Sequence, residues 1–260
     1  MNSAFLNFLV ILWKTAGNNT TWRKFLYRQL RRSGKTPDYA FSRDFYGLKY
    51  RGNLNNNIDA NVFFYGAFEK PLLFFLRDAL NAITTEIPKP IFVDVGANVG
   101  QHSLFLSKFA WQVLAFEPYC KVSMQFKRQI AHNNISNIQI FENGLSDRLE
   151  TLNYYAPTGN NEGIGSFDEN SIIKGNKSYG KLELQEGDQV IESGSWNGIK
   201  LIKIDVERVC QLNRFAHIGS FLQPSVHRIQ DLCGNPRAIF WHVQSKDWVC
   251  LIIDLFQFAL

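Results

Sequence analysis

The segment from Ile91 to Pro118 constrains the fold more than any other part of this 260-residue chain. It opens with Ile91–Val95, an apolar run rich in β-branched residues that is typical of a buried parallel strand. The glycine turn Gly96–Gly100 and an apolar helical stretch follow, and a second strand, Gln112–Phe116, ends in an acidic residue. Such an order makes up half of a nucleotide-binding βαβ unit, so the sequence predicts an α/β fold.

The residue types of this segment suit a nucleotide cofactor. Gly96 and Gly100 let the backbone approach a ligand with no Cβ in the way, and Asn98 lies between them. The N–H groups at the start of the helix favour an anion. Glu117 lies at the tip of the neighbouring strand, where a carboxylate accepts both hydrogens of a ribose diol. For His102, after the turn, a solvated first-turn position is expected, with a cofactor contact as the alternative.

The glycine pattern distinguishes two cofactors. The dehydrogenase fingerprint G-x-G-x-x-G is absent, because the turn reads G-x-x-x-G with Asp94 two residues before it. A pyrophosphate requires the helix dipole and three glycines, whereas the amino-acid end of S-adenosylmethionine requires an acid near its ammonium group. Asp94 provides that acid, so the pattern favours S-adenosylmethionine over NAD. Alternatively, Asp94 only caps its strand, although a buried acid without a partner is costly.

Six short motifs follow one another between Asp59 and Glu207. They are Gly66–Glu69, Phe92–Gly100, Ala115–Pro118, Asn143–Asp147, Asn160–Gly163 with Ser166, and Leu201–Glu207. In this order they resemble the FkbM-type S-adenosylmethionine-dependent methyltransferases. The resemblance implies a doubly wound, mostly parallel seven-stranded sheet of the Rossmann-like, class I methyltransferase type. It also implies methyl transfer, usually to a hydroxyl oxygen of a sugar or secondary metabolite.

The resemblance extends to further site residues. It places the adenine contacts at Asn143 or Asp147, and both stay candidates. Asp205 and Glu207 lie at the carboxyl end of the expected strand Lys200–Val206, the edge at which ligands bind in such sheets. Either carboxylate can accept the acceptor's proton or position its hydroxyl. The alternative is that both only cap the following helix.

Residues 150–198 form an insertion between two expected strands. It contains Tyr154 and Tyr155, the Gly/Asn-rich loop Thr158–Ser166, and the alternating stretch Lys181–Gln185. Two interpretations stay open: a lid over the acceptor, or an ordinary hairpin with a flexible tip.

The N-terminal residues 1–58 are expected to be a basic, helical extension of the methyltransferase core at 59–207. The apolar run Ala4–Trp13 is too short to span a bilayer and lacks the flanks of a signal peptide, and the basic cluster Arg23–Lys35 follows it. A docking helix with a solvated basic face is favoured, and peripheral contact with an anionic membrane is the alternative.

Residues 37–57 are expected to be a connection. A helix is expected from about Glu69 to Ile83.

The charge distribution argues against a nucleic-acid partner. Residues 1–40 hold seven basic side chains against Asp38 alone, whereas residues 41–207 hold 16 basic and 19 acidic ones. The net charge of +5 therefore comes from the ends of the chain and not from its body.

The four cysteines contain no C-x-x-C pair and fit reduced thiols of a cytoplasmic protein. Their spacing with the histidines fits no zinc site.

The C-terminal residues 208–260 depart from the family pattern. The family continues the D-V-E motif with Gly and a second Glu, whereas this chain continues with Arg208-Val209-Cys210 and has no further glutamate. One hypothesis is a frameshifted tail, which reading the coding DNA in all frames would test. Against it, Gln223–Val226 resembles the opening of the family's next strand, and the runs Ala238–Val243 and Val249–Phe256 suit final strands.

Three functional hypotheses follow from these observations. The first is an S-adenosylmethionine-dependent methyltransferase that acts on a hydroxyl of a small-molecule or glycan acceptor. The second is an impaired remnant that at most binds the cofactor. The third is an NAD-binding module, which requires nicotinamide affinity that depends on Glu117.

Overall fold

The computed structural model describes most of the chain, and the fold below refers to these residues alone. They are residues 3–15, 20–33, 36–84, 89–146, 148–158, 165–194, 196, 198–205, 226–229, 238–245 and 248–255. The chain divides into two compact units. The first comprises Met1–Phe68, and the second comprises Glu69–Thr158 and Glu162–Leu260. The family resemblance, which begins at Asp59, therefore starts inside the first unit.

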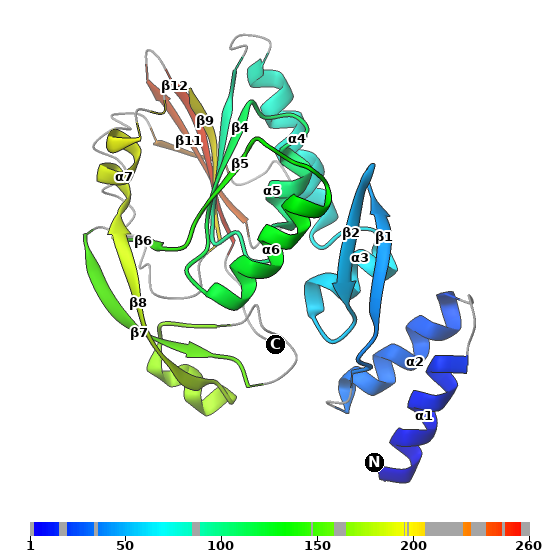
Figure 1. Cartoon of the computed structure of the whole chain (residues 1–260). Helices are drawn as coiled ribbons and strands as arrows, with labels where there is room; N and C mark the ends of the chain where they lie inside the picture. The colour runs from blue at the N-terminus through cyan, green and yellow to red at the C-terminus, as the bar shows by residue number, and fades with distance from the viewer. Residues whose placement is uncertain are drawn as a thin grey trace. The chain divides into compact units, whose positions relative to one another are not determined.

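The first unit packs three helices with a two-stranded sheet (Figure 1). Its elements are α1 (Ser3–Thr15), α2 (Thr20–Arg32), β1 (Ala40–Phe45), β2 (Leu48–Asn53) and α3 (Asn57–Tyr65). Its core gathers large apolar side chains from the helices and the segment after β2: Leu9, Trp13, Leu26, Tyr27, Leu30, Leu54, Ala60 and Phe63. Among the described residues, no helix is both long enough and apolar enough to cross a membrane.

The expectation of a plain connection over residues 37–57 was wrong, because this stretch forms an antiparallel hairpin. Tyr46 and Gly47 connect β1 to β2 with φ angles of 53° and 87°. Positive φ at both central residues is the geometry of a type I′ turn, whose twist matches the flanking strands. The buried Asp59 carboxylate fixes the hairpin to α3, since it accepts hydrogen bonds from Tyr50 Oη at 2.7 Å and Asn53 N at 2.8 Å.

The second unit is built on a seven-stranded sheet in the order β10-β11-β12-β9-β3-β4-β5. The strands are β3 (Ile91–Val95), β4 (Gln112–Phe116), β5 (Ile138–Phe141), β9 (Ile199–Ile204), β10 (Val226–Ile229), β11 (Ala238–Ser245) and β12 (Trp248–Leu255). Strands β12, β9, β3, β4 and β5 pair in parallel, and β11 is antiparallel to both of its neighbours. The prediction of a mostly parallel, seven-stranded, Rossmann-like α/β sheet is therefore confirmed.

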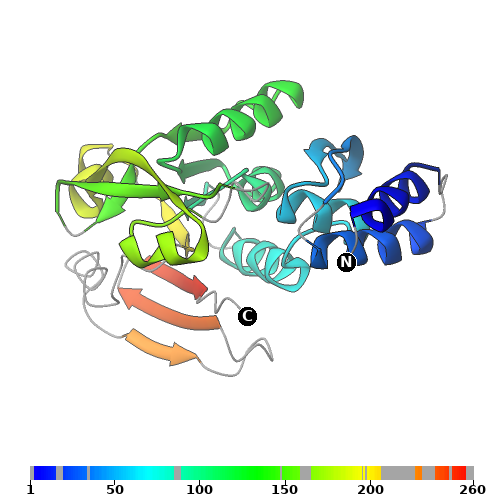
Figure 2. The ribbon, with the colours of Figure 1, turned by 90° about the horizontal axis from the view of Figure 1, so that it is seen from below.

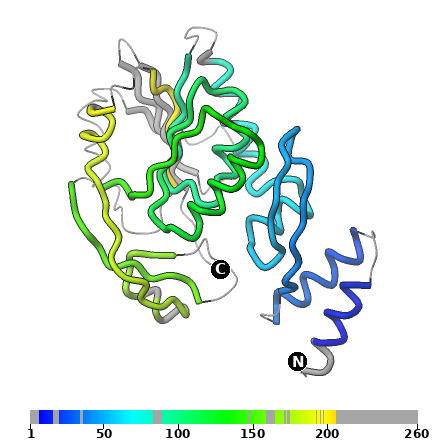
Figure 3. Tube along the Cα trace, viewed as in Figure 1, coloured from blue at the N-terminus to red at the C-terminus, as the bar shows by residue number. Residues whose placement is uncertain are grey.

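Helices cover both faces of this sheet, as expected for a doubly wound fold. They are α4 (Lys70–Thr84), α5 (Gln101–Leu106), α6 (Cys120–His132) and α7 (Gly187–Ser193). Figure 1 shows α4, α5 and α6 on one face and α7 on the other, and Figure 3 traces the path from β3 through α5 to β4 and through α6 to β5. The expected helix over 69–83 is confirmed as α4.

Alternating residues of the central strands separate the two layers of the core. Val93, Phe116 and Ile202 belong to a buried cluster against which Val190 and Ile191 of α7 pack. The intervening residues of the same strands point to the face of α4, α5 and α6, because successive strand residues point to opposite faces. Asp94 and Lys203 are on the face that α4, α5 and α6 cover.

The last three strands of the sheet lie beyond residue 225. Figure 2 shows β10, β11 and β12 side by side, and β12 pairs in parallel with β9 through Leu251–Asp254. The prediction that residues 238–243 and 249–256 supply strands is confirmed over the described residues, because β11 and β12 cover them. Residues 206–225, which include the expected strand opening before Val226, lie outside the described residues.

The insertion at 150–198 supplies two strands of a second, three-stranded sheet in the order β6-β8-β7, and the third strand, β6, directly precedes it. Its strands are β6 (Gly144–Ser146), β7 (Glu150–Ala156) and β8 (Lys177–Glu186), with a 3₁₀ helix, η1 (Glu169–Lys174), between the last two. Its antiparallel β7–β8 pair is a long hairpin, and residues 159–164 of the connecting loop lie outside the described residues. Tyr154 packs with Tyr119 and Tyr179, at ring-centroid distances of 5.1 and 6.2 Å.

Candidate functional site

The carboxyl ends of four parallel strands bring the predicted site residues to one edge of the main sheet. The glycine turn follows β3, Glu117 follows β4, Asn143 lies two residues beyond β5, and Asp205 follows β9. The sheet order places these strands next to one another as β9-β3-β4-β5. This edge is where open α/β sheets bind ligands.

The turn after β3 has a backbone that favours glycine. Gly96, Asn98 and Gly100 have φ angles of 73°, 53° and 79°. The N–H groups of Gly96 and Ala97 both donate to Phe116 O at 3.0 Å, which ties the turn to the end of β4. A Cβ on Gly100 would lie 2.0 Å from the Phe126 ring, so no side chain fits there. The prediction of a tight glycine turn is confirmed.

Glu117 is the residue that links this turn to the neighbouring strand. Its Oε2 accepts a hydrogen bond from Asn98 N at 2.9 Å, and its Oε1 accepts one from Tyr119 N at 2.9 Å. Burial raises the pKa of Glu117 to about 7, although these two N–H donors act in the opposite direction. Because a carboxylate oxygen has two acceptor sites, each oxygen keeps one for a further donor.

Asp94 is fully buried and engaged inside the fold. Its Oδ1 accepts a hydrogen bond from Lys203 Nζ at 2.9 Å, and its Oδ2 accepts one from Ser103 Oγ at 2.6 Å. Asp94 and Lys203 are directly opposite each other in the parallel pairing of β3 and β9, and they are 0% and 1% exposed. Burial raises the pKa of Asp94, but Lys203 and Ser103 outweigh burial and hold it below its usual value.

Asp205 also lies close to Lys203. Its Oδ2 is 3.8 Å from Lys203 Nζ, and its backbone N–H donates to Val95 O at 2.9 Å. Burial raises the pKa of Asp205 above its ordinary value, Lys203 lowers it, and the negative charge of Asp94 raises it further. Lys203 therefore lies between two carboxylates, Asp94 from β3 and Asp205 just after β9. The second predicted catalytic carboxylate, Glu207, lies outside the described residues.

Asn143, one of the two predicted adenine contacts, is tied to the insertion. Its Nδ2 donates to Gln185 Oε1 at 3.1 Å and to Gly144 O at 3.3 Å. It therefore lies where the main sheet meets β8. The other candidate, Asp147, lies outside the described residues.

The expectation of a solvated His102 was wrong, because this histidine is buried in α5. Burial and the nearby Lys203 lower the pKa of His102 to about 3, so its ring is neutral. Its Nε2 is 3.9 Å from Glu69 Oε2, which is too long for a hydrogen bond. Burial and the charge of Asp205 raise the pKa of Glu69 to about 7, against the opposing effect of Lys203. Within the described residues, neither His102 Nε2 nor Glu69 Oε2 has a hydrogen-bond partner.

Sequence reasoning missed two of the ionisable residues here. Lys203 is one of two lysines in the otherwise apolar strand β9, and a lysine buried in such a strand requires an acid nearby. That signal was readable from Leu201–Ile204 together with Asp94. Glu69 belongs to the Gly66–Glu69 motif and begins the expected helix, but neither pattern predicts its backbone φ of 46° or its buried carboxyl.

A metal centre is not among the arrangements seen. Across the described part of the chain, no group of three or more His, Cys, Asp and Glu side chains is placed to hold a metal ion.

Comparisons with known proteins give structural likenesses only. No family model matches the chain, and no curated protein matches it. Among solved structures, an rRNA methylase from Streptococcus thermophilus is 12% identical, with 53% of each chain covered and a TM-score of 0.30. A SAM-dependent methyltransferase from Agrobacterium tumefaciens is 10% identical, with 64% of this chain and 39% of that chain covered and a TM-score of 0.36.

A third similar structure was determined with a bound ligand. A Pyrococcus abyssi tRNA (uracil-54, C5)-methyltransferase in complex with S-adenosyl-L-homocysteine is 12% identical, with 41% of this chain and 24% of that chain covered and a TM-score of 0.27. This chain thus spans about half of the first of these proteins and less of the other two. At such identities and TM-scores, the likenesses fix neither an activity nor a ligand for this chain.

Proposed function

We propose that this protein is an S-adenosylmethionine-dependent methyltransferase, related to the FkbM type, that methylates a hydroxyl oxygen of a small-molecule or glycan acceptor. The observation that carries the proposal is the bridge from Glu117 to Asn98, which joins the acid at the tip of β4 to the glycine turn after β3. An acid and a glycine turn held together at the carboxyl edge of a parallel sheet suit the ribose and amino-acid parts of a nucleoside cofactor.

Glu117 and Asp94 differ in how well they suit contact with this cofactor. Glu117 fits a ribose diol, because each of its oxygens keeps an acceptor site beyond its bond to Asn98 or Tyr119. Asp94 offers no exposed oxygen, since it is 0% exposed and already paired with Lys203. We therefore assign Asp94 a positioning role beneath the turn, and the direct contact with the cofactor's ammonium group stays a prediction.

The chain's own contribution to methyl transfer is position and proton management. S-adenosylmethionine supplies an activated methyl group on a sulfonium, so the protein needs to align an acceptor oxygen with it and exclude water. Asp205 and Glu69 both lie near Lys203 at the same edge, and burial raises the pKa of each carboxyl. A carboxylate with a raised pKa is a better proton acceptor for a hydroxyl, so these two groups are our candidates for that task, with Glu207 as a further one.

The binding part of the proposal is tested by calorimetry on the full chain. We expect S-adenosylmethionine and S-adenosylhomocysteine to bind, and NAD not to bind. Glu117→Ala removes the diol acceptor and is expected to weaken binding by at least about tenfold, on the scale of hydrogen bonds to a charged group. Glu142→Ala is the matched control, because Glu142 follows the adjacent strand β5 and is exposed with Lys127 as its partner.

The catalytic part is tested separately, by transfer of labelled methyl from S-adenosylmethionine to glycan and lipid-sugar extracts. Binding with no transfer would support the remnant hypothesis instead of an active enzyme. NAD binding that depends on Glu117, with no S-adenosylmethionine binding, would replace the proposal with the NAD-binding module.

A further inference from the structure

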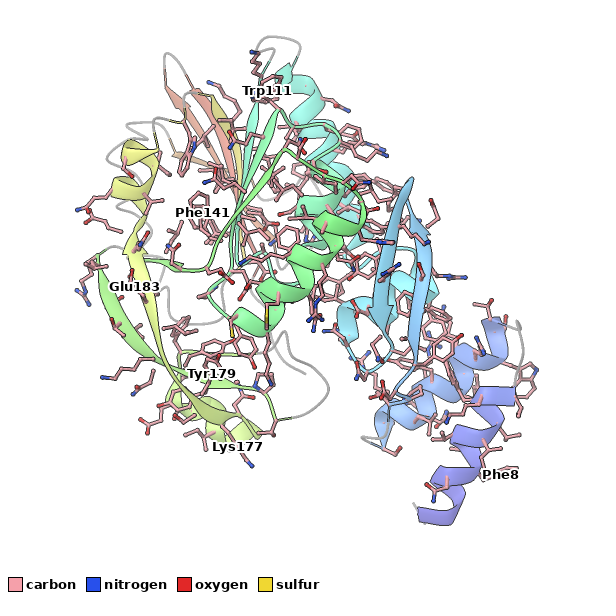
Figure 4. All side chains as sticks on the ribbon, in the orientation of Figure 1. Phe8, Trp111, Phe141, Lys177, Tyr179 and Glu183 are labelled. Atoms are coloured by element: carbon pink, nitrogen blue, oxygen red, sulfur yellow. The ribbon has the colours of Figure 1, made fainter. Side chains whose placement is uncertain are left out.

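Helix α1 carries apolar side chains on a buried face and on a second, exposed face. Leu9 and Trp13, one helical turn apart, are buried in the core of the first unit. Phe8, Ile11 and Leu12 have the i, i+3, i+4 spacing of a second face and are 53%, 59% and 37% exposed. Figure 4 shows Phe8 projecting from α1 on the side away from α2. A docking helix accounts for the buried face, but it does not explain why the other face is apolar.

Helix α2 repeats this arrangement. Leu26, Tyr27 and Leu30 are buried, whereas Trp22 and Phe25 are 59% and 52% exposed. The two exposed rings contact each other edge to face, with centroids 6.0 Å apart. Single exposed apolar residues are ordinary on protein surfaces, but several large ones on two packed neighbouring helices indicate an interaction surface.

Cationic side chains accompany both exposed faces. They include Lys14, Lys24, Arg28, Arg31 and Arg32, none of which has an ion pair within the described residues. Two of them contact an aromatic residue instead: Lys24 Nζ lies 3.8 Å from the Tyr65 ring centroid, and Arg28 Nη2 donates to Tyr65 Oη at 3.1 Å. These contacts leave the positive charges without neutralisation.

We propose that α1 and α2 dock the protein on the surface of a bilayer that contains anionic phospholipids. Exposed Phe, Ile, Leu and Trp side chains enter the boundary between headgroups and acyl chains, while Lys and Arg interact with lipid phosphates. A nucleic acid would use the cations but leave Phe8 and Ile11 unexplained. A second apolar protein surface would leave the uncompensated charge unexplained. The proposal is independent of the proposed methyl transfer.

The proposal is tested by sedimentation of the full chain with vesicles. We expect binding to vesicles of phosphatidylglycerol and phosphatidylcholine, and little binding to vesicles of phosphatidylcholine alone. The double variant Phe8→Gln/Ile11→Gln is expected to lose at least about tenfold in partitioning, because two apolar side chains no longer insert. Arg31→Gln/Arg32→Gln is expected to lose about tenfold as well, and added salt should reproduce that loss.

Matched controls come from the second unit. Leu149→Gln removes a 70% exposed apolar residue and Lys181→Gln removes an exposed cation, and neither should change vesicle binding. All altered residues are solvent-exposed, so circular dichroism should show an unchanged fold.

Equal binding to neutral and anionic vesicles, or unchanged binding of the Phe8/Ile11 variant, would overturn the proposal. A dimer that this variant dissociates, without vesicle binding, would identify a self-association surface. Tight RNA binding that only the arginine variant abolishes would identify a nucleic-acid surface.

Discussion

Glu69 has a carboxyl group whose charge depends on small changes of its surroundings. It lies just before α4 with a φ of 46°, a conformation that is rare for residues other than glycine and that often occurs at functional sites. Its Oε2 faces His102 Nε2 at 3.9 Å, and both atoms are buried. A carboxyl with a pKa of about 7 beside a neutral histidine is the kind of perturbed pair that clusters at functional sites.

The pH dependence of stability tests this environment. The folded protein keeps the Glu69 proton up to a pKa of about 7, whereas the unfolded chain releases it near 4.5. The free energy of unfolding therefore falls as the pH rises between those two values, because the unfolded chain then binds fewer protons at Glu69 than the folded protein does. Glu69→Gln is therefore expected to match the wild type near pH 4 and to be more stable at pH 8, by at most about 3 kcal/mol. The opposite effect of His102, whose pKa of about 3 destabilises the fold as the pH falls below 6.5, is present in both proteins and cancels.

Urea unfolding at several pH values measures this difference. The exposed carboxylate of Glu183, labelled in Figure 4, gives the matched control Glu183→Gln, for which no comparable trend is expected. A wild-type advantage that is constant from pH 4 to pH 8 would contradict the assigned environment of Glu69.

The elements of the second unit were largely predictable from local sequence patterns. Apolar β-branched runs mark β3 and β9, and the glycine turn between β3 and α5 was legible because only glycine suits positions such as Gly100. The hairpin β1–β2 was missed because its strands expose polar side chains, so apolar alternation gives little signal, and because its Tyr-Gly turn is not a common hairpin dipeptide.

Some residues of the candidate site were likewise predictable from the sequence, and others were not. The positions of Gly96, Asn98 and Glu117 follow from spacing along one βαβ unit, and spacing is visible in a sequence. The pairing of Lys203 with Asp94 joins residues 109 positions apart, and it depends on the register between β3 and β9. Register is set by packing of the whole sheet, so sequence patterns alone do not reveal it.

At the element scale, Gly100 controls how closely α5 and α6 approach. Gly100→Ala places a Cβ 2.0 Å from the Phe126 ring and also forces a φ of 79° on alanine. We expect a loss of stability of about 2 kcal/mol or more, from overpacking and backbone strain together. Gly175→Ala is the control, since its φ is 99° but its nearest neighbour would be 4.0 Å away, and about 1 kcal/mol is expected. Equal losses in the two variants, measured by urea unfolding, would contradict the steric role of Gly100.

At the scale of the whole molecule, the chain has two separate cores. One gathers Trp13, Leu26 and Leu30 from the first unit, and the other gathers Val93, Phe116 and their neighbours around the main sheet. Every described residue assigned to the cofactor, from Asp94 to Asn143, belongs to the second unit. Binding and unfolding of that unit should therefore be linked, independently of the first.

Scanning calorimetry is expected to show two unfolding transitions. S-adenosylhomocysteine should raise the midpoint of one only, because a ligand stabilises the unit that binds it. Leu30→Ala, which truncates a fully buried side chain of the first unit, should lower the other midpoint, at a cost of about 2–5 kcal/mol. A single transition that responds to both changes would show that the units unfold together.

The burial of Lys203 has a consequence for the reactivity of its amine. Burial alone would lower the pKa of Lys203, but Asp94 and Asp205 raise it, and the side chain is 1% exposed. A protonated, inaccessible amine does not react with acylating reagents, whereas exposed lysines such as Lys181 do. Acylation of Lys203, followed by mass spectrometry, would therefore time the opening of the sheet centre in the native protein. Labelling of Lys203 as fast as of Lys181 would show that this ion pair does not persist.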